Sequence, residues 1–324
     1  MNEFVERIIR KAYSLVGLSR EALYANRPQP DVLTAEEANG RIAATIREGS
    51  PAMISRFGTP ESLTILNYLD LCCFRNQSLL SRIHARFQGR WEVWQDAVRN
   101  LISNNVGFFP PTDACLERFV PFYIEQIRKM DMIGVWDFVP GESFLMNRYC
   151  PGAVRFDPSA LEPYFSVNPW SGLLRGLRVL VVHPFTRSIE AQYQRREKLF
   201  DDPRILPEFD LVTVKAVQSL AGTPTPFQDW FEALDWMKTR IESLPFDVAI
   251  IGAGSYGLPL SAHVKSLGKI AIHMGGATQI LFGIRGKRWD EMPAFQRFFN
   301  DAWVRPLPGE GIPEGAKVEN GCYW

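Results

Sequence analysis

The sequence predicts an α/β fold, namely a Rossmann-like, doubly wound, mostly parallel sheet preceded by an N-terminal helical extension. Two observations predict this fold. Short apolar runs rich in Val and Ile lack the alternation of half-exposed strands, as expected for strands buried on both faces. In the second half, these runs alternate with helical segments, which is typical of parallel crossovers. Strands are expected there at Arg178–His183, 211–216, 247–251 and 269–273, and helices at 188–200, 227–243 and 257–267.

The composition excludes several classes of protein. A chain of 324 residues, 46% of them hydrophobic, can bury a substantial core as one large domain or two closely packed ones. Basic and acidic residues balance at 36 each and form no long run of one sign, which argues against nonspecific nucleic-acid binding. The five cysteines show no C-x-x-C spacing, so we expect reduced thiols in a cytoplasmic protein, without zinc. The sequence carries no signal for oligomeric state.

The N-terminal segment predicts an amphipathic helix. Residues 1–18 mix apolar and charged side chains at helical spacing, without the apolar centre of a secretory signal. We expect this helix to pack on its own domain or a partner subunit, with peripheral membrane contact as the alternative. No apolar run is long enough to span a membrane. We divide the chain into a helical extension (1–50), a main domain (51–300, with a weak internal boundary at 150–176) and an irregular tail (301–324).

The first helix of the main body has clear end signals. Thr34 and Glu37 have the spacing of a capping box, and Gly49 can end the helix, so we predict it over Ala35–Glu48. A short buried strand at 51–56 is expected next. A turn with the sequence R-F-G-T-P-E and another helix then follow.

The R-F-G-T-P-E turn is the first place where chemistry is expected. Arg56 leaves the strand, Gly58 permits the turn, and Glu61 stands in the first turn of the helix. Open α/β sheets bind ligands at the carboxyl ends of their strands. Arg56 is therefore predicted to hold a phosphate, and Glu61 to bind a metal or to act as a base. The structural alternative is that Glu61 complements the helix dipole and pairs with Arg56.

The next segment combines aromatic and amide side chains. Trp91 and Trp94 lie at helical spacing, which indicates core packing. The stretch N-N-V-G-F-F-P-P is predicted to be a polar, turn-rich connection before a helix that Thr112 caps. Asn104 and Asn105 beside two phenylalanines suit recognition of a sugar or a base. A loop that only caps its neighbours is the alternative.

Polar residues are also expected at the ends of three other strands. Asp137 and Glu142 follow a strand predicted over 130–136 and are candidate contacts to an acceptor or sugar. His183 ends its strand, where it would contact the nucleotide or serve a structural role. Lys215 lies in an otherwise apolar strand, so it needs a carboxylate partner or reaches the same ligand.

A glycine turn follows the strand V-A-I-I. Gly252, Gly254 and Gly257 have the spacing G-x-G-x-x-G, with Ser255 and Tyr256 between them. Glycines here bring backbone N–H groups close to a ligand, and the following helix points the positive end of its dipole at the same place. We expect this turn to bind the diphosphate of a nucleotide. Tight packing of the helix on its strand is the structural alternative.

The sequence after this turn favours a nucleotide diphosphate over a dinucleotide. A dinucleotide site has an acidic residue about twenty positions on to hold the ribose, but the sequence there is A-I-H-M, so NAD is not expected. Gly275 and Gly276 offer a second close approach of backbone to a ligand. Lys287 and Arg288 follow in a glycine-bearing loop that would clamp a diphosphate or form a solvated basic turn.

The segments RFGTPE, DVAIIGAGSYGLPL, KIAIHMGGATQILFGI and GKRW, in this order, resemble the bacterial glycosyltransferases of the GT-D fold. The resemblance covers residues 52–289. It implies one Rossmann-like domain with a phosphate- and metal-binding turn. It also implies transfer of a sugar from a UDP- or GDP-type donor to a growing surface glycan.

The family's first turn typically carries Asp-x-Glu, a pair associated with manganese. Here Glu61 matches, and Thr59 stands where the aspartate is expected. Because hard cations prefer carboxylates, a Mn²⁺ or Mg²⁺ cofactor stays open. In one alternative, Asp137, Glu142 or substrate phosphates complete the metal shell. In the other, no metal is needed, and the charge of the leaving group is carried by Arg56, Lys215 and the loop that contains Lys287 and Arg288.

The sequence therefore predicts a cytoplasmic glycosyltransferase of the hexosyltransferase class. Its donor is a nucleotide sugar and its acceptor is a glycan hydroxyl. Glu61 is the expected base, and the glycine turns with a cation stabilise the departing diphosphate. One alternative is another Rossmann enzyme that uses NAD or S-adenosylmethionine. The other is a non-catalytic nucleotide-sugar-binding protein.

Overall fold

The computed structural model describes residues 3–75, 77–313, 315, 318 and 321–324. Within these residues, seven strands form one sheet in the order β3-β2-β1-β7-β6-β4-β5, and every pair is parallel. The predicted α/β, Rossmann-like, doubly wound fold is therefore confirmed. The strands are β1 (Ala52–Arg56), β2 (Met132–Gly134), β3 (Val154–Phe156), β4 (Arg178–His183), β5 (Asp210–Lys215), β6 (Val248–Ile251) and β7 (Ile270–His273).

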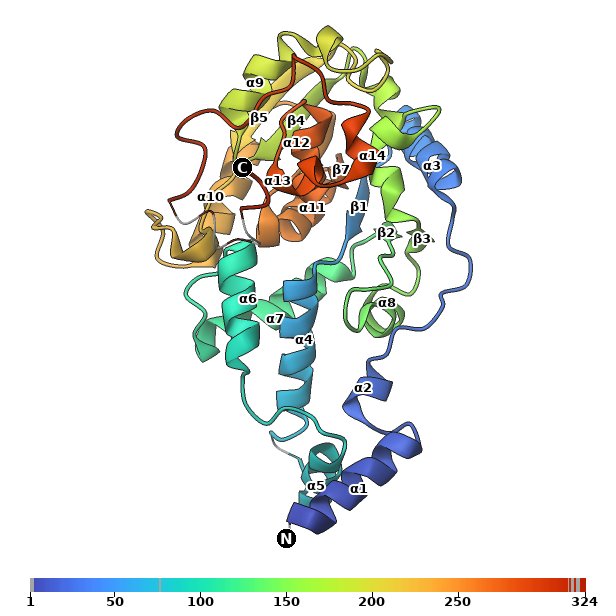
Figure 1. Ribbon diagram of the computed structural model, residues 1–324, viewed down its shortest axis with the longest axis vertical. Helices are drawn as coiled ribbons and strands as arrows, with labels where there is room; N and C mark the ends of the chain where they lie inside the picture. The colour runs from blue at the N-terminus through green and yellow to red at the C-terminus, as the bar shows by residue number, and fades with distance from the viewer. Residues whose placement is uncertain (1–2, 76, 314, 316–317, 319–320) are drawn as a thin grey trace.

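Helices cover both faces of this sheet (Figure 1). Those of the first half, among the described residues, are α1 (Glu3–Leu15), α2 (Arg20–Leu23), α3 (Ala35–Glu48), α4 (Thr59–Cys72), α5 (Leu79–Phe87), α6 (Asp96–Val106), α7 (Asp113–Ile127) and α8 (Glu142–Tyr149). Those of the second half are α9 (Thr186–Tyr193), α10 (Trp230–Glu242), α11 (Gly257–Ser266), α12 (Thr278–Leu281), α13 (Lys287–Asp290) and α14 (Pro293–Gln296). Short 3₁₀ turns, including η6 (Gly254–Tyr256) and η7 (Gly275–Ala277), lie between them.

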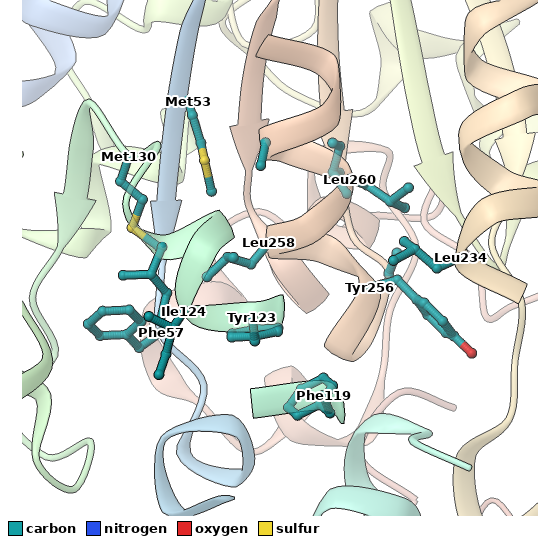
Figure 2. Close-up of a cluster of buried hydrophobic side chains, with 14 of the residues drawn as sticks. Met53, Phe57, Phe119, Tyr123, Ile124, Met130, Leu234, Tyr256, Leu258 and Leu260 are labelled. Atoms are coloured by element: carbon teal, nitrogen blue, oxygen red, sulfur yellow. The ribbon is translucent and has the colours of Figure 1, made fainter. Parts of the chain in front are cut away.

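The alternation of side chains along each strand produces two hydrophobic cores. Met53 of β1 points to the face covered by α7, α10 and α11, and Figure 2 shows part of that cluster. Ile54, the next residue, points to the opposite face, where α3, α9 and α12 pack. Strands such as β6 are fully buried, because both of their faces are covered. This explains their continuous apolar sequences.

The N-terminal extension does not form one unit. The capping box of Thr34 and Glu37 is present and Gly49 ends α3 in the left-handed conformation, as predicted. However, α3 buries Ala38 and Ile42 in the core of the main domain, so it belongs to that domain. Helix α1 instead packs on α5, at the end of the molecule where the N-terminus lies (Figure 1).

The C-terminal part of the chain is irregular, as predicted, apart from short helical turns. Positions 314, 316–317 and 319–320 of the predicted tail lie outside the described residues. Trp303 is buried, and Tyr323 and Trp324 pack partly buried against the core on the α3 and α9 side of the sheet. The tail therefore returns to the main domain and reaches the loops that follow β7.

Because all strands run in one direction, their carboxyl ends share one edge of the sheet. The residues at this edge include Arg56 after β1, Trp136 after β2, His183 at the end of β4 and His273 at the end of β7. Strand β1 lies next to β7, although the two are far apart in the sequence. Ligands of such sheets bind at this edge, so it positions the candidate site.

Candidate functional site

Arg56 is the last residue of β1 and stands at the carboxyl edge of the sheet. Its guanidinium donates a hydrogen bond to the carbonyl oxygen of Phe57 at 3.2 Å, and no carboxylate of the described residues comes within 4.0 Å of it. The guanidinium lies against Gly275 in the loop after β7, where any Cβ would collide with it. The turn after β1 and the loop after β7 therefore meet through this arginine.

Glu61 is the third residue of α4 and is only 5% exposed. Its side chain folds back onto Gly58, where an added Cβ would collide with the carboxylate. One carboxylate oxygen, Oε2, is buried and makes no hydrogen bond with any residue that the structure describes. Burial raises the pKa of Glu61, and a hydrogen bond from its own backbone N–H and the charge of Arg56 partly offset this. The β1 turn thus holds a buried carboxyl group with an unused acceptor.

His273 lies beside this turn and was not predicted as a site residue. Its Nδ1 is 2.9 Å from the Ser55 hydroxyl oxygen, and its Nε2 packs against Gly257, where no Cβ would fit. Burial lowers the pKa of His273 well below its ordinary value, and Arg56 adds to this effect. The imidazole is therefore neutral. A histidine at the end of a predicted strand was the available signal, the same signal that singled out His183.

Four more side chains that sequence reasoning did not assign to a site interact with Arg56 through its charge. The ring of Trp136 is 5.7 Å from the guanidinium carbon, and its Nε1 is buried without a hydrogen-bond partner. Burial raises the pKa of Tyr123, Glu162 and Tyr323, and the positive charge of Arg56 opposes the rise at each. These four groups come from distant segments, and Trp136 is the one whose ring faces the Arg56 guanidinium.

The turns after β6 and β7 also touch. A Cβ on Gly252 would lie 2.5 Å from the Gly275 carbonyl oxygen, 2.7 Å from the Thr278 hydroxyl and 2.8 Å from the His183 ring. The Thr278 hydroxyl is buried and has no hydrogen-bond partner. His183 accepts a hydrogen bond from the Phe185 N–H at 3.0 Å, and burial lowers its pKa to about 3. His183 is thus neutral and buried, which favours the structural alternative for this residue.

The glycine turn itself is occupied by the protein's own chain. The Ser255 hydroxyl donates to the Val106 carbonyl at 2.7 Å and accepts from the Trp230 indole at 2.8 Å. Tyr256 stacks on Trp230 with ring centroids 5.1 Å apart. The Val106 carbonyl oxygen, at the end of α6, also lies against Gly254. The Ser255 and Tyr256 side chains are therefore buried in internal contacts, which favours tight packing, the structural alternative for this turn.

Two further predictions need correction. Asn104 and Asn105 lie in the last turn of α6, and the predicted polar connection begins only at Gly107. Lys215 ends the edge strand β5 and is exposed to solvent. Four strand spacings, about 19 Å, separate it from Arg56. The reasoning that Lys215 is buried and needs a partner was wrong, because β5 has no neighbour on its outer side.

The loop that contains Lys287 and Arg288 contributes one residue near the site. The guanidinium of Arg288 is 5.2 Å from the Tyr323 ring, whose edge packs on Gly276. Burial raises the pKa of Tyr323, and Arg288 opposes the rise more strongly than Arg56 does. Arg288 and Arg56 therefore both approach this phenol. Lys287, the neighbour of Arg288, is exposed to solvent.

The loop after β2 carries the remaining candidates. Asp137 is exposed and adopts a positive φ of 58°. Glu142 accepts hydrogen bonds from the backbone N–H groups of Trp136 at 3.0 Å and Asp137 at 2.9 Å. Its other oxygen is buried without a partner, and burial raises its pKa to about 7. Glu142 therefore shapes the loop that places Trp136 beside Arg56.

The residues present do not match a metal site built by the protein alone. Among the described residues, no group of three or more His, Cys, Asp or Glu side chains is placed to share a metal ion. In the β1 turn, Glu61 supplies a carboxylate and Thr59 supplies none. Mn²⁺ and Mg²⁺ sites draw on several oxygen ligands, so the single carboxylate of this turn does not hold such an ion by itself.

A shallow pocket of the described residues lies outside this site. Its lining includes Leu71, Arg75 and Trp94, at the far end of α4 from Glu61. Leu71 is about 15 Å along the helix from Glu61, so the pocket belongs to another surface.

Comparison of the chain with protein-family models, with curated proteins and with solved structures finds no match.

Proposed function

We propose that the chain is a cytoplasmic glycosyltransferase of the hexosyltransferase class. It would move a sugar from a UDP- or GDP-type donor to a glycan hydroxyl in bacterial surface glycan assembly. The resemblance of the β1 and β6 turns to GT-D glycosyltransferases supports this reaction class, and five free cysteines fit a reducing compartment. Among the described residues, no helix could cross a membrane.

One observation carries the proposal. Among the described residues, an arginine with no carboxylate within 4.0 Å stands at the carboxyl edge of the central strands, beside a buried glutamate that has one oxygen without a hydrogen bond. Cations there suit an anionic ligand, and a carboxyl group beside that ligand suits a general base in its ionised form, which the charge of Arg56 favours. Group transfer from a sugar diphosphate needs both functions.

Arg56 and the Gly275-Gly276 backbone would hold the diphosphate. In the transfer step, the bond from the anomeric carbon to the diphosphate oxygen breaks, and the electron pair leaves with the diphosphate. The acceptor oxygen forms the new bond to that carbon, and its proton passes to the Glu61 carboxylate. Arg56 stabilises the negative charge that develops on the leaving group.

Calorimetric titration tests the donor. We expect UDP or GDP to bind the wild-type chain, and Arg56→Ala to weaken this binding by about tenfold to a hundredfold, because one charge-assisted contact contributes about 1.5–3 kcal/mol. Lys215→Ala is the matched control, since it removes a cation from the end of β5 and should leave affinity unchanged. Thermal denaturation of both variants verifies their folding.

Other outcomes decide between the alternatives. Binding of only NADH or S-adenosylmethionine would assign the chain to another class of Rossmann enzyme. Tight binding of a nucleotide sugar without transfer or hydrolysis, with or without Mn²⁺, would make it a non-catalytic binding protein.

A further inference from the structure

A second surface of the molecule is built around α1 and α5. We call residues 7–20 and 78–90 the α1/α5 lobe. Tyr13 of α1 packs on α5, with ring centroids 5.4 Å from His84 and 5.9 Å from Phe87. The Arg20 N–H donates to the Gln88 carbonyl at 2.7 Å. The lobe lies at the end of the molecule that contains the N-terminus, away from the sheet (Figure 1).

Exposed apolar side chains are concentrated on this lobe. It carries seven of the fourteen exposed large hydrophobic residues found among the described part of the chain. Leu15 and Leu80 are each 79% exposed, and Leu79 is 71% exposed. The others are Ile8, Val16, Leu18 and Ile83. Such a concentration marks an interaction surface, whereas single exposed apolar residues are ordinary.

The same lobe is basic, although the whole chain has 36 basic and 36 acidic residues. Residues 7–20 and 78–90 contain no Asp or Glu; Glu3 and Glu6 precede them. Arg20 and Arg90 bind Asp70, at 2.5 and 3.4 Å, and so fasten the lobe to α4. Three further cations of the lobe are exposed, namely Arg7, Lys11 and Arg82, and Arg86 lies 3.7 Å from Glu92.

We propose that the α1/α5 lobe binds the surface of a membrane that contains anionic lipids. Apolar side chains would enter the boundary between headgroups and acyl chains, and the cations would contact lipid phosphates. The binding would be peripheral, since no helix of the described residues could cross the bilayer. This inference depends on the lobe alone and not on the function proposed for the sheet edge.

The charge distribution argues against a second copy of the chain as the occupant. A twofold dimer buries the same patch of both subunits against itself. That arrangement would bring exposed cations such as Lys11 and Arg82 of one lobe against those of the other, and like charges at an interface are unfavourable. An anionic surface complements both the charge and the projecting leucines.

Vesicle co-sedimentation of the full chain tests the proposal. We expect binding to phosphatidylcholine vesicles that contain phosphatidylglycerol, little binding to phosphatidylcholine alone, and weakening by added salt. Lys11→Glu with Arg82→Glu, and separately Leu79→Ser with Leu80→Ser, should each reduce the bound fraction at least tenfold. All four side chains are exposed, so these variants should fold normally.

Lys215→Glu and Val167→Ser are the matched controls, because both residues are exposed and lie outside the lobe. Neither should change vesicle binding. Absence of co-sedimentation, or equal binding with and without phosphatidylglycerol, would overturn the proposal. If light scattering instead detects a dimer that Leu79→Ser with Leu80→Ser dissociates, the lobe is a self-association surface and the proposal is wrong.

Discussion

The turns after β1 and β6 both contain glycine but differ in how their polar groups are used. In the β6 turn, the Ser255 hydroxyl bonds to Val106 and Trp230, and Gly254 packs on the Val106 carbonyl. In the β1 turn, Arg56 has no carboxylate within 4.0 Å among the described residues, and Glu61 Oε2 has no partner. The β6 turn uses its polar groups for internal packing. The β1 turn leaves its charged groups without such partners.

This difference shows why glycine spacing alone is weak evidence for a phosphate site. The positive end of α11 would attract an anion, but the carboxyl end of α6 already presents a carbonyl to the turn before it. Two helix ends of opposite polarity therefore meet there. The unused charges lie instead on β1 and against the loop after β7, so the candidate site is centred on Arg56.

The largest expected effect is loss of sugar transfer in Glu61→Gln. Removing a general base typically reduces the rate by about a hundredfold to ten thousandfold, whereas Gln keeps the size of the side chain. Donor binding should be nearly unchanged, because Arg56 and the Gly275 backbone remain. Transfer assays and nucleotide titration on the same preparation measure both quantities. A fully active Glu61→Gln enzyme would remove this residue from the mechanism.

A matched pair of glycine substitutions compares the two regions directly. Gly275 and Gly254 both have positive φ, 65° and 52°, so alanine at either position adds similar backbone strain of about 1–2 kcal/mol. At Gly275 the new Cβ also collides with the Arg56 guanidinium, whereas at Gly254 it meets the Val106 carbonyl. Gly275→Ala should therefore lose donor affinity about tenfold or more, and Gly254→Ala should lose stability alone.

Chemical denaturation and nucleotide titration of both variants provide the measurements. Equal losses of affinity in Gly275→Ala and Gly254→Ala would contradict the assignment of Gly254 to packing. Unchanged affinity in both would show that Arg56 does not contact the donor.

The sequence predicted much of the fold because the signals were local. Strand β4 and the capped helix α3 have the predicted bounds, since apolar runs and caps are encoded by neighbouring residues. Strand β3 was missed because it has only three residues and lies in a proline-rich connection. Lys215 was misjudged because its exposure depends on β5 being an edge strand, and strand order is set by long-range pairing.

The candidate site was predictable only in part, for the same reason. Arg56 and Glu61 share one turn, so their proximity follows from the sequence. Gly275 and Tyr323 come to this site through the packing of distant segments, since Arg56 packs on Gly275 and Tyr323 packs on Gly276, and no local pattern encodes these contacts. The contact of α6 with the glycine turn is likewise tertiary, and it decides how that turn is used.

The smallest expected effect concerns Glu142, which supports the loop beside the β1 turn. Burial raises its pKa from 4.5 to about 7. Below pH 4.5 the carboxyl is protonated in both folded and unfolded chains; as the pH rises toward 7, the unfolded chain releases its proton first and is stabilised. Relative to Glu142→Gln, the wild type should therefore lose about 1–3 kcal/mol of unfolding free energy between pH 4.5 and 7.

Denaturation at pH 5 and 8 measures this difference, with Glu48→Gln, at an exposed position, as the control. An equal pH dependence in wild type and Glu142→Gln would mean that folding does not raise the pKa of Glu142, and that its carboxyl group is ionised in the folded protein at pH 7.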